Sequence, residues 1–167
     1  ILNQSFENFT YLIIDNGSTD DSADTIRQYA ETDPRITYIR LDKNVPWTEK
    51  GLLTKLKENI RTAYVAMVDS DDYYEPEFLE KTINISRADG SDMVQVNTLT
   101  YGHEGFRYNY FTHYFGRDIC IEGDEKKHYF MLRILSVPVW GKLYKSHLFK
   151  ELIDMMLAYG TEDERDC

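Results

Sequence analysis

Short apolar runs and amphipathic stretches follow one another along the first hundred residues. The apolar runs, several of them rich in β-branched residues, predict strands at 10–14, 35–42, 63–68 and 92–101. Apolar residues at helical spacing predict helices between these strands, at 18–33, 51–60 and 76–88. This alternation predicts an α/β fold with a mainly parallel sheet covered by helices.

The pattern loosens beyond Gly102. Residues 103–123 hold short, tyrosine-rich segments that fit either strands or loops. Helical spacing returns at 125–135 and at 145–157, on either side of Pro138. Because the sequence shows no repeat, low-complexity tract or linker, we expect a single domain.

Two of the predicted helices carry recognisable start signals. Ser18 and Asp21 resemble a capping box for the first helix. Pro76 suits the first position of the third helix, and Asp72 is placed to favour its dipole. The expected apolar faces comprise Ala23, Ile26, Tyr29 and Ala30 in the first helix and positions 78, 79, 83 and 85 in the third.

Three aspartates, Asp69, Asp71 and Asp72, directly follow the apolar run at 63–68. Carboxylates that are this close repel one another and raise one another's pKa unless they share a cation. Capping would explain Asp72 but does not require the other two. On this stretch alone, a metal or phosphate site and a polar turn before a helix remain equal alternatives.

The strand at 10–14 also runs into polar residues, Asp15 and Asn16. In a parallel sheet these would reach the same edge as Asp69 and Asp71, which is the edge where open α/β sheets bind ligands. Gly17 permits a tight turn, and the helix that follows could present its N-terminus to an anion. Carboxylates facing amide donors suit a nucleotide diphosphate with a divalent metal ion.

Composition narrows the class of protein. The 167 residues are 42% hydrophobic and 29% charged, which is ordinary for a soluble globular domain. The formal net charge of −10 argues against a nucleic-acid partner. Cys120 and Cys167 are too few and too far apart for a disulfide framework or a zinc site, which favours a reducing compartment. No run approaches the roughly 18 apolar residues of a membrane span.

Four motifs then occur in order: "ILNQSFENFTYLIIDNGSTDDS", "AYVAMVDSDDYYEPEFLEK", "VWGKLYKSHLF" and "GTEDE". Together they resemble the inverting family 2 glycosyltransferases of the GT-A fold, most of all the bacterial enzymes that extend capsule, lipopolysaccharide or teichoic-type polymers. The resemblance implies a single Rossmann-like GT-A domain over 1–167, with a nucleotide-sugar-binding half at 1–100 and an acceptor-binding half at 101–167. Since the chain starts at Ile1, we expect a fragment or a processed chain that lacks the family's first strand.

The same resemblance implies roles for the strand-end residues. Asp15 and Asn16 fall where the family holds the base of the donor nucleotide, although many members carry aspartate in place of Asn16. The segment Asp69-Ser70-Asp71 matches the D-x-D motif. By that match Asp71 would coordinate Mn²⁺ or Mg²⁺ bridging the diphosphate, and Asp69 would support the ribose or the metal.

The second half of the chain carries the other expected site residues. Asp163 matches the family's catalytic base, which would take the proton of the acceptor hydroxyl. Without the family match, a solvated acidic tail would be the preferred interpretation of this segment. Trp140 resembles a residue just before the acceptor site, where its ring would either stack on a sugar or be buried. Lys142 could pair with a carboxylate or with a phosphate.

The expected function is therefore transfer of a sugar, with inversion, from a nucleotide-diphosphate donor such as a UDP-sugar to a glycan or lipid-linked acceptor. We expect a cytoplasmic location, either free or peripheral at the inner face of the cell membrane. One alternative is a catalytically inactive domain of the same fold that binds nucleotide or acts as a scaffold. It is favoured by Thr48-Glu49, which stands where members usually carry an Ala-Arg-Asn segment. A nucleotidyltransferase is a weaker alternative, because no Gly-rich loop with a nearby basic residue is found.

Overall fold

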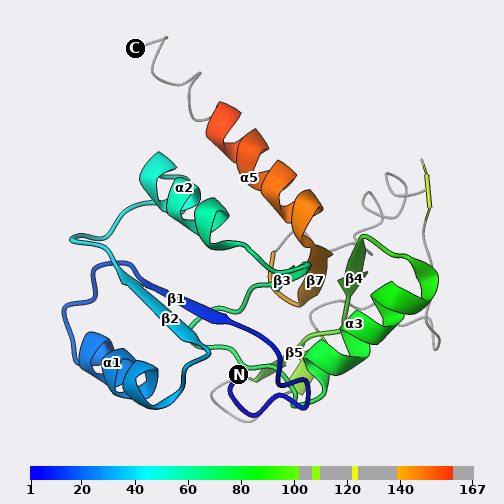
Figure 1. The fold of residues 1–167 in the computed structure, drawn as a ribbon, viewed down its shortest axis with the longest axis horizontal. Coiled ribbons are helices and arrows are strands. Elements are labelled where there is room, and N and C mark those ends of the chain that lie inside the picture. Colours follow the sequence, from blue (N-terminus) through cyan, green and yellow to red (C-terminus); the bar gives the residue numbers. More distant parts are fainter. Residues whose placement is uncertain (102–106, 110–121, 124–138, 160–167) are drawn as a thin grey trace. The chain divides into compact units, whose positions relative to one another are not determined.

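The computed structural model describes residues 1–101, 107–109, 122–123 and 139–159, and these belong to two compact units (Figure 1). Unit 1 comprises residues 1–65 and 145–167, and unit 2 comprises residues 66–144. The chain passes from one unit to the other within strand β3 (Tyr64–Ala66) and again within strand β7 (Lys142–Lys145). Each unit is described separately below.

Unit 1 contains a pair of parallel strands, β1 (Tyr11–Asp15) and β2 (Ile36–Arg40). The register places Tyr11 opposite Ile36 at one end of the pair and Asp15 opposite Arg40 at the other. Helix α1 (Ser22–Thr32) connects the two strands and packs against β2 (Figure 1). This β-α-β arrangement confirms the order of elements predicted for residues 10–42.

The core of unit 1 lies largely between two helices, α2 (Lys50–Asn59) and α5 (Ser146–Tyr159), which lie side by side (Figure 1). Both match their predicted ranges to within two residues. Their contact is apolar, as expected for helices with a single apolar stripe. The most buried side chains of these helices are Leu52, Leu53, Leu56, Phe149 and Ile153. An ion pair between Lys57 and Asp154 joins the same two helices at the surface.

Unit 2 combines helix α3 (Phe78–Asp89) with short strands. Strand β4 (Met93–Gln95) pairs with β7 in the antiparallel direction, and β3, β7 and β4 form a three-stranded sheet in that order. Strands β5 (Leu99–Tyr101) and β6 (Arg107–Asn109) form a separate antiparallel pair. The α/β class predicted from the sequence is confirmed, with parallel pairing in unit 1 and antiparallel pairing in unit 2.

The strand predicted at 92–101 is in fact two strands. It is interrupted after Gln95, where the Val96 N–H donates a 3.0 Å hydrogen bond to the carbonyl oxygen of Gly141. Gly141, which directly precedes β7, has a positive φ of 69°, so the backbone there turns away from the β4–β7 pair. The apolar run at 63–68 likewise forms only a three-residue strand. The helix predicted at 125–135 lies outside the described residues.

Helix α1 starts later than its predicted capping box, and helix α3 starts two residues after Pro76. Helix α1 begins at Ser22, because the backbone N–H of Ser18 donates to the side chain of Asp15 and holds Ser18 in the preceding turn. Helix α3 begins at Phe78, and the side chain of its N-cap residue, Glu77, accepts no hydrogen bond from the first backbone N–H groups of the helix. Pro76 lies in a turn before this helix, and Asp72 therefore does not cap it.

The apolar faces of α1 and α3 also differ from the prediction at one residue each. Tyr29 is 56% exposed and Ile85 is 38% exposed. A helix turns by about 100° per residue, which places Tyr29 well away from Ala23 around α1. In α3 the middle of the buried face is polar: the Thr82 hydroxyl donates to the Phe78 carbonyl and the Ser86 hydroxyl to the Ser91 carbonyl.

Candidate functional site

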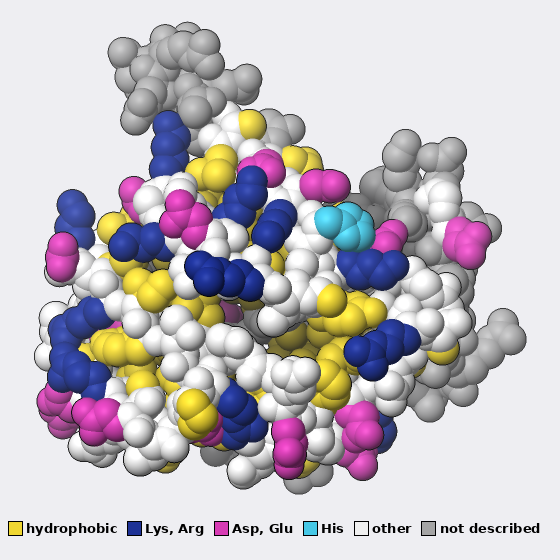
Figure 2. Space-filling view, viewed as in Figure 1, with side chains coloured by type: hydrophobic (Ala, Val, Ile, Leu, Met, Phe, Trp, Pro, Cys, Tyr) yellow, Lys and Arg dark blue, Asp and Glu magenta, His cyan; other side chains and the backbone are white. Residues whose placement is uncertain are grey.

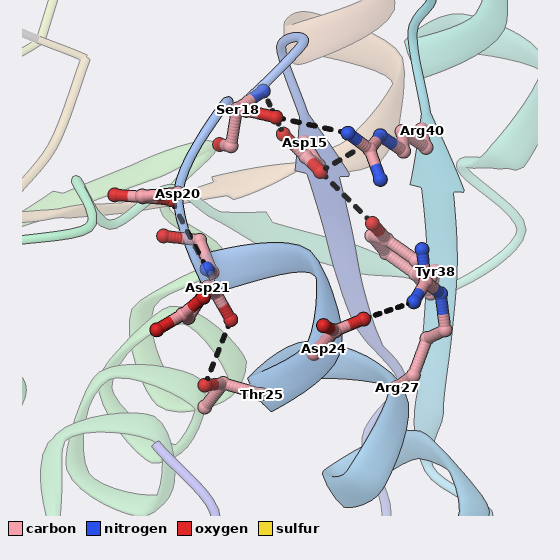
Figure 3. A network of polar contacts seen from close by, with 10 residues as sticks. Asp15, Ser18, Asp20, Asp21, Asp24, Thr25, Arg27, Tyr38 and Arg40 are labelled. Atoms are coloured by element: carbon pink, nitrogen blue, oxygen red, sulfur yellow. Dashed lines mark hydrogen bonds and ion pairs between the residues drawn. The ribbon is translucent and has the colours of Figure 1, made fainter.

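A buried carboxylate lies at the end of β1. The Asp15 residue is 4% exposed, and its side chain is surrounded by donors from three directions (Figure 3). Its Oδ1 accepts a 2.7 Å hydrogen bond from the Ser18 backbone N–H, and its Oδ2 accepts a 2.9 Å hydrogen bond from the Tyr38 hydroxyl. The Nε of Arg40 lies 3.5 Å from Oδ2, and an Nη of the same guanidinium donates to the Ser18 carbonyl.

These contacts determine the charge of Asp15. Burial alone would raise its pKa, but the hydrogen bonds from Ser18 and Tyr38 and the charge of Arg40 together bring the pKa below its ordinary value of 3.8. The same arrangement raises the pKa of the Tyr38 hydroxyl, through burial and through its bond to the carboxylate. Asp15 is therefore an ionised acceptor that holds the turn after β1 in place.

The side chain of Asn16 is bonded to the loop that follows β2. Its Nδ2 donates to the Val45 carbonyl and to the Asn44 side chain, each at 2.8 Å, and its Oδ1 accepts from the Val45 N–H at 2.9 Å. The neighbouring Gly17 has a φ of 76°, and a Cβ at this position would lie 2.5 Å from the carbonyl carbon of Lys43. Binding of a nucleotide base by the Asn16 amide, as predicted, would require an exchange of these hydrogen bonds.

Glu49, which departs from the usual family pattern, has a structural role at the start of α2. Its carboxylate accepts a 2.7 Å hydrogen bond from the Leu52 N–H and is the N-cap of the helix. Hydrogen bonds from the backbone of Gly51 and Leu52 lower the pKa of this carboxyl. The N-terminus of α2 therefore already holds an anion from the chain itself.

In unit 2, the D-x-D residues lie in an exposed turn just after β3. The Asp72 N–H donates a 3.1 Å hydrogen bond to the Asp69 carbonyl, which closes the turn, and Asp69, Asp71 and Asp72 are all exposed. Partial burial raises the pKa of the Asp72 carboxyl, and the negative charges of Asp71 and Asp69 raise it further. At Asp72, therefore, the repulsion that the sequence predicted for this turn is confirmed.

Tyr74 anchors this turn to the segment around Trp140. Its hydroxyl donates to the Met67 carbonyl and is also hydrogen-bonded to the backbone of Gly141. Its ring stacks on Phe78 with centroids 3.7 Å apart and an interplanar angle of 10°. The turn that carries Asp69 and Asp71 and the turn that carries Trp140 are therefore held together within unit 2. Trp140 is half-buried, so neither of its two predicted roles is excluded.

Lys142 follows this turn on β7 and is 3% exposed. Burial lowers the pKa of its ammonium group from 10.5 to about 8. An anion brought close to this side chain would raise that pKa and favour the charged form. Its pairing with a carboxylate or with a phosphate stays a prediction.

The predicted site residues are therefore distributed over both units. Asp15 and Asn16 belong to unit 1, whereas Asp69, Asp71 and Trp140 belong to unit 2. Convergence of the two groups stays a prediction, and Asp163 lies outside the described residues. The sequence analysis missed Tyr38 and Arg40. Their signal was present, because parallel register places the end of the strand at 35–42 beside Asp15.

The donor set at the D-x-D turn fits a hard divalent cation. Carboxylate oxygens are ligands that Mn²⁺ and Mg²⁺ prefer. Within the described ranges, however, no group of three or more His, Cys, Asp or Glu side chains is arranged to hold a metal ion. Asp69 and Asp71 would therefore need oxygen ligands from a bound molecule, such as a diphosphate, to complete a coordination shell.

Comparison with known proteins identifies the family. The model of a family described as "Glycosyl transferase family 2" matches residues 1–153. The chain belongs to this family. Its α/β elements fit the GT-A fold expected of a family 2 glycosyltransferase. In the part of the chain that the structure describes, no helix is long and apolar enough to cross a membrane.

Relatives of this family 2 chain include several bacterial glycosyltransferases. Glycosyltransferase GlyA of Streptococcus pneumoniae is 26% identical over 91% of this chain and 22% of its own length. Glycosyltransferase GlyG of the same organism is 28% identical over 91% of this chain and 52% of its own length. Chondroitin synthase of Escherichia coli is 31% identical over 53% of this chain and 12% of its own length. The chain thus spans about half of one curated relative and much less of the other two.

Proposed function

We propose that this family 2 domain is a metal-dependent, inverting glycosyltransferase that moves a sugar from a nucleotide-diphosphate donor, a UDP-sugar, to a glycan or lipid-linked acceptor. The observation that carries the proposal is the exposed turn at the end of β3, where Asp69 and Asp71 lie in a chain of this family. The name of one relative, chondroitin synthase, supports a sugar polymer as the product.

Several groups of this chain would hold the donor. Asp71, supported by Asp69, would hold Mn²⁺ or Mg²⁺ together with the diphosphate. Such a cation, when bound, would neutralise the charge of the leaving diphosphate. The turn after β1 would hold the base. There, Asp15 fixes the loop through Ser18 and Asn16 fixes it through Val45, so both residues would act at least partly by positioning the backbone.

The acceptor would be activated by a carboxylate. A sugar hydroxyl is a poor nucleophile, and its proton must leave as the new bond forms, so a positioned general base accelerates the reaction by about 10²–10⁴-fold. We assign this role to Asp163 on the motif "GTEDE". With attack from the face opposite the diphosphate, the configuration at the anomeric carbon inverts. Trp140 would contact the acceptor.

A second candidate is a domain of the same family that binds nucleotide without transferring sugar. The observation that favours it is Glu49, whose carboxylate already occupies the N-terminus of α2 in the segment where the family pattern is lost. In this case nucleotide would bind, but no sugar would be transferred to any acceptor.

The first experiment is calorimetric titration of UDP, with and without Mn²⁺, into the unaltered chain and the Asp71→Ala variant. We expect Mn²⁺ to strengthen UDP binding. In the presence of Mn²⁺, Asp71→Ala should weaken UDP binding by at least about tenfold, because the cation would lose a ligand. Asp92→Ala is the matched control, since it removes an exposed carboxylate of the same unit outside the turn.

The outcomes separate the two candidates. Equal binding by Asp71→Ala and the unaltered chain would refute the donor site at this turn. Metal-dependent binding, followed by transfer that Asp163→Asn abolishes, would support the enzyme. Binding without transfer across a panel of glycan and lipid-linked acceptors would favour the non-catalytic domain.

A further inference from the structure

Tyr73 is an exposed aromatic residue directly beside the D-x-D turn. It follows Asp72 in the sequence, and 60% of its surface is exposed to solvent. An exposed aromatic ring offers an apolar face that a ligand can cover, and Tyr73 does so directly beside the turn where the proposed donor binds. The inference below rests on the proposed function, because that proposal places the substrate at this turn.

The backbone on both sides of Tyr73 is held in place. Before it, the Asp72 N–H closes the turn on the Asp69 carbonyl. After it, Tyr74 is fixed by its hydroxyl bonds and by the stack of its ring on Phe78. The Phe78 N–H in turn donates to the Glu75 carbonyl at 3.0 Å. The Tyr74 side chain makes these contacts within unit 2, and Tyr73 is the more exposed tyrosine of the two.

The chemistry of the surroundings favours an uncharged ligand group at Tyr73. The carboxylates of the turn and the formal charge of −10 disfavour a second anionic group at Tyr73, because the proposed cation would already be shared by Asp71 and the diphosphate. Figure 2 shows both basic and acidic side chains on the face of the described residues that it views. A sugar ring is uncharged, and its C–H faces can lie against an aromatic ring while its hydroxyls stay hydrated.

We infer that Tyr73 is a sugar-contacting residue: its exposed ring, directly after the Asp69–Asp72 turn, stacks on a sugar ring of the substrate bound there. The sugar lies next to the diphosphate in the donor, whereas the base is separated from the diphosphate by the ribose. The acceptor sugar must approach the same carbon of the donor. Donor and acceptor sugars are therefore the two sources of this contact, and the base is not.

The test uses Tyr73→Ala and Tyr73→Phe, with Tyr29→Ala as the matched control. Tyr29 is a tyrosine of similar exposure, 56%, on α1 in unit 1. Each variant is titrated in the presence of Mn²⁺ with UDP and with UDP-glucose, UDP-galactose and UDP-N-acetylglucosamine. Where transfer is detected, the KM for the acceptor is also measured. Because Tyr73 is exposed, the thermal midpoint of unfolding should stay unchanged in both variants.

We expect Tyr73→Ala to leave UDP binding unchanged and to lose about two- to tenfold in affinity for the UDP-sugar that the unaltered chain binds best, or the same factor in acceptor KM. The first result assigns the donor sugar and the second the acceptor sugar. Tyr73→Phe and Tyr29→Ala should behave like the unaltered chain.

Two results would overturn the inference while leaving the proposed function intact. One is an equal loss for UDP and UDP-sugars, which would place the base or the metal against Tyr73. The other is no change in either UDP-sugar affinity or acceptor KM. If the unaltered chain binds neither UDP nor any UDP-sugar, the proposed donor site fails and the inference fails with it.

Discussion

At the scale of single residues, Asp15 combines burial with a retained negative charge. Ser18, Tyr38 and Arg40 supply donors or positive charge to its carboxylate from the turn and from the neighbouring strand (Figure 3). Losing one donor would leave a buried carboxylate under-solvated. Asp15 therefore stabilises the turn after β1, independently of any contact that it makes with a bound nucleotide.

The first prediction concerns the pH dependence of stability. The pKa of Asp15 is lowered in the folded state, so the unfolded chain binds a proton at this residue more readily. The resulting stabilisation is complete above the unfolded pKa near 3.8 and is lost as pH falls through the lower folded pKa. Tyr38→Phe removes one donor and should reduce the stability at pH 7 and flatten its decline below pH 4. Urea unfolding from pH 7 to pH 2 measures both effects.

Tyr29→Phe is the control for this experiment, because it removes a tyrosine hydroxyl from an exposed position on α1. If Tyr38→Phe and Tyr29→Phe gave the same stability profile against pH, the hydroxyl of Tyr38 would have no part in holding the charge of Asp15.

At the scale of elements, the turn after β1 is held against the loop after β2 by close backbone approach. Asn16 bonds to both polar groups of the Val45 backbone, and Gly17 approaches Lys43 more closely than any side chain would allow. Glu49, the N-cap residue of α2, lies a few residues further along the same loop. The proposed base-binding turn therefore depends on the segment between β2 and α2, which includes the Glu49 cap.

The second prediction follows from the two glycines with positive φ. Gly17 and Gly90 have φ values of 76° and 77°, but a Cβ at Gly90 would meet nothing within 4 Å. Alanine at either position costs about 1–2 kcal/mol for the left-handed backbone. Gly17→Ala should lower the free energy of unfolding by clearly more than Gly90→Ala, because its Cβ would also clash with Lys43. Equal losses in urea denaturation would mean that the loop simply moves away.

At the scale of the whole molecule, the main electrostatic feature is the excess of acid. The formal net charge is −10 over 167 residues, with 29 acidic and 19 basic side chains. Such an excess keeps a protein soluble but destabilises the compact state through self-repulsion. Among the described residues, the ion pairs of Arg27 with Asp24 and Lys81 with Glu77 lie at the surface, where each contributes little.

The third prediction is that added salt stabilises the folded chain. Raising the KCl concentration from about 10 mM to about 150 mM shortens the screening length to roughly 8 Å and weakens the net repulsion. We expect the thermal midpoint of unfolding, measured by calorimetry at pH 7 without divalent ions, to rise. A falling midpoint would show that attractive pairs outweigh the repulsion. Sucrose at equal osmolality controls for effects other than screening.

The elements whose bounds were predicted best are those with a clear apolar run or a clear apolar stripe. The strands β1 and β2 and the helices α2 and α5 lie within one or two residues of their expected bounds, because each has a clear apolar run or stripe. The start of α1 and the apolar face of α3 differ from the prediction, because polar side chains there make tertiary or backbone hydrogen bonds instead. Asp15 accepts the Ser18 N–H that Asp21 would have bonded in the predicted capping box, and the Thr82 hydroxyl of α3 is buried against a backbone carbonyl.

The candidate site was predictable as residue types but not as contacts. The D-x-D turn and the strand-end position of Asp15 follow from local sequence. The hydrogen bonds between Tyr38 and Asp15 and between Tyr74 and Gly141 join residues that are distant in sequence. They depend on strand register and on turn geometry, which a single pattern of apolar residues does not determine.

The division of unit 1 between the two ends of the chain affects how the protein is made. The Ser146 N–H donates to the Ala63 carbonyl, and its hydroxyl donates to the Thr62 carbonyl. These bonds join two parts of unit 1 that are far apart in the sequence. During synthesis, residues 1–65 emerge from the ribosome long before α5, and α5 is the helix that covers the apolar stripe of α2. Until α5 is translated, that stripe is exposed and available to chaperones or to unwanted association. Unit 2 is continuous, so on the ribosome it can finish folding first, although it begins later in the chain.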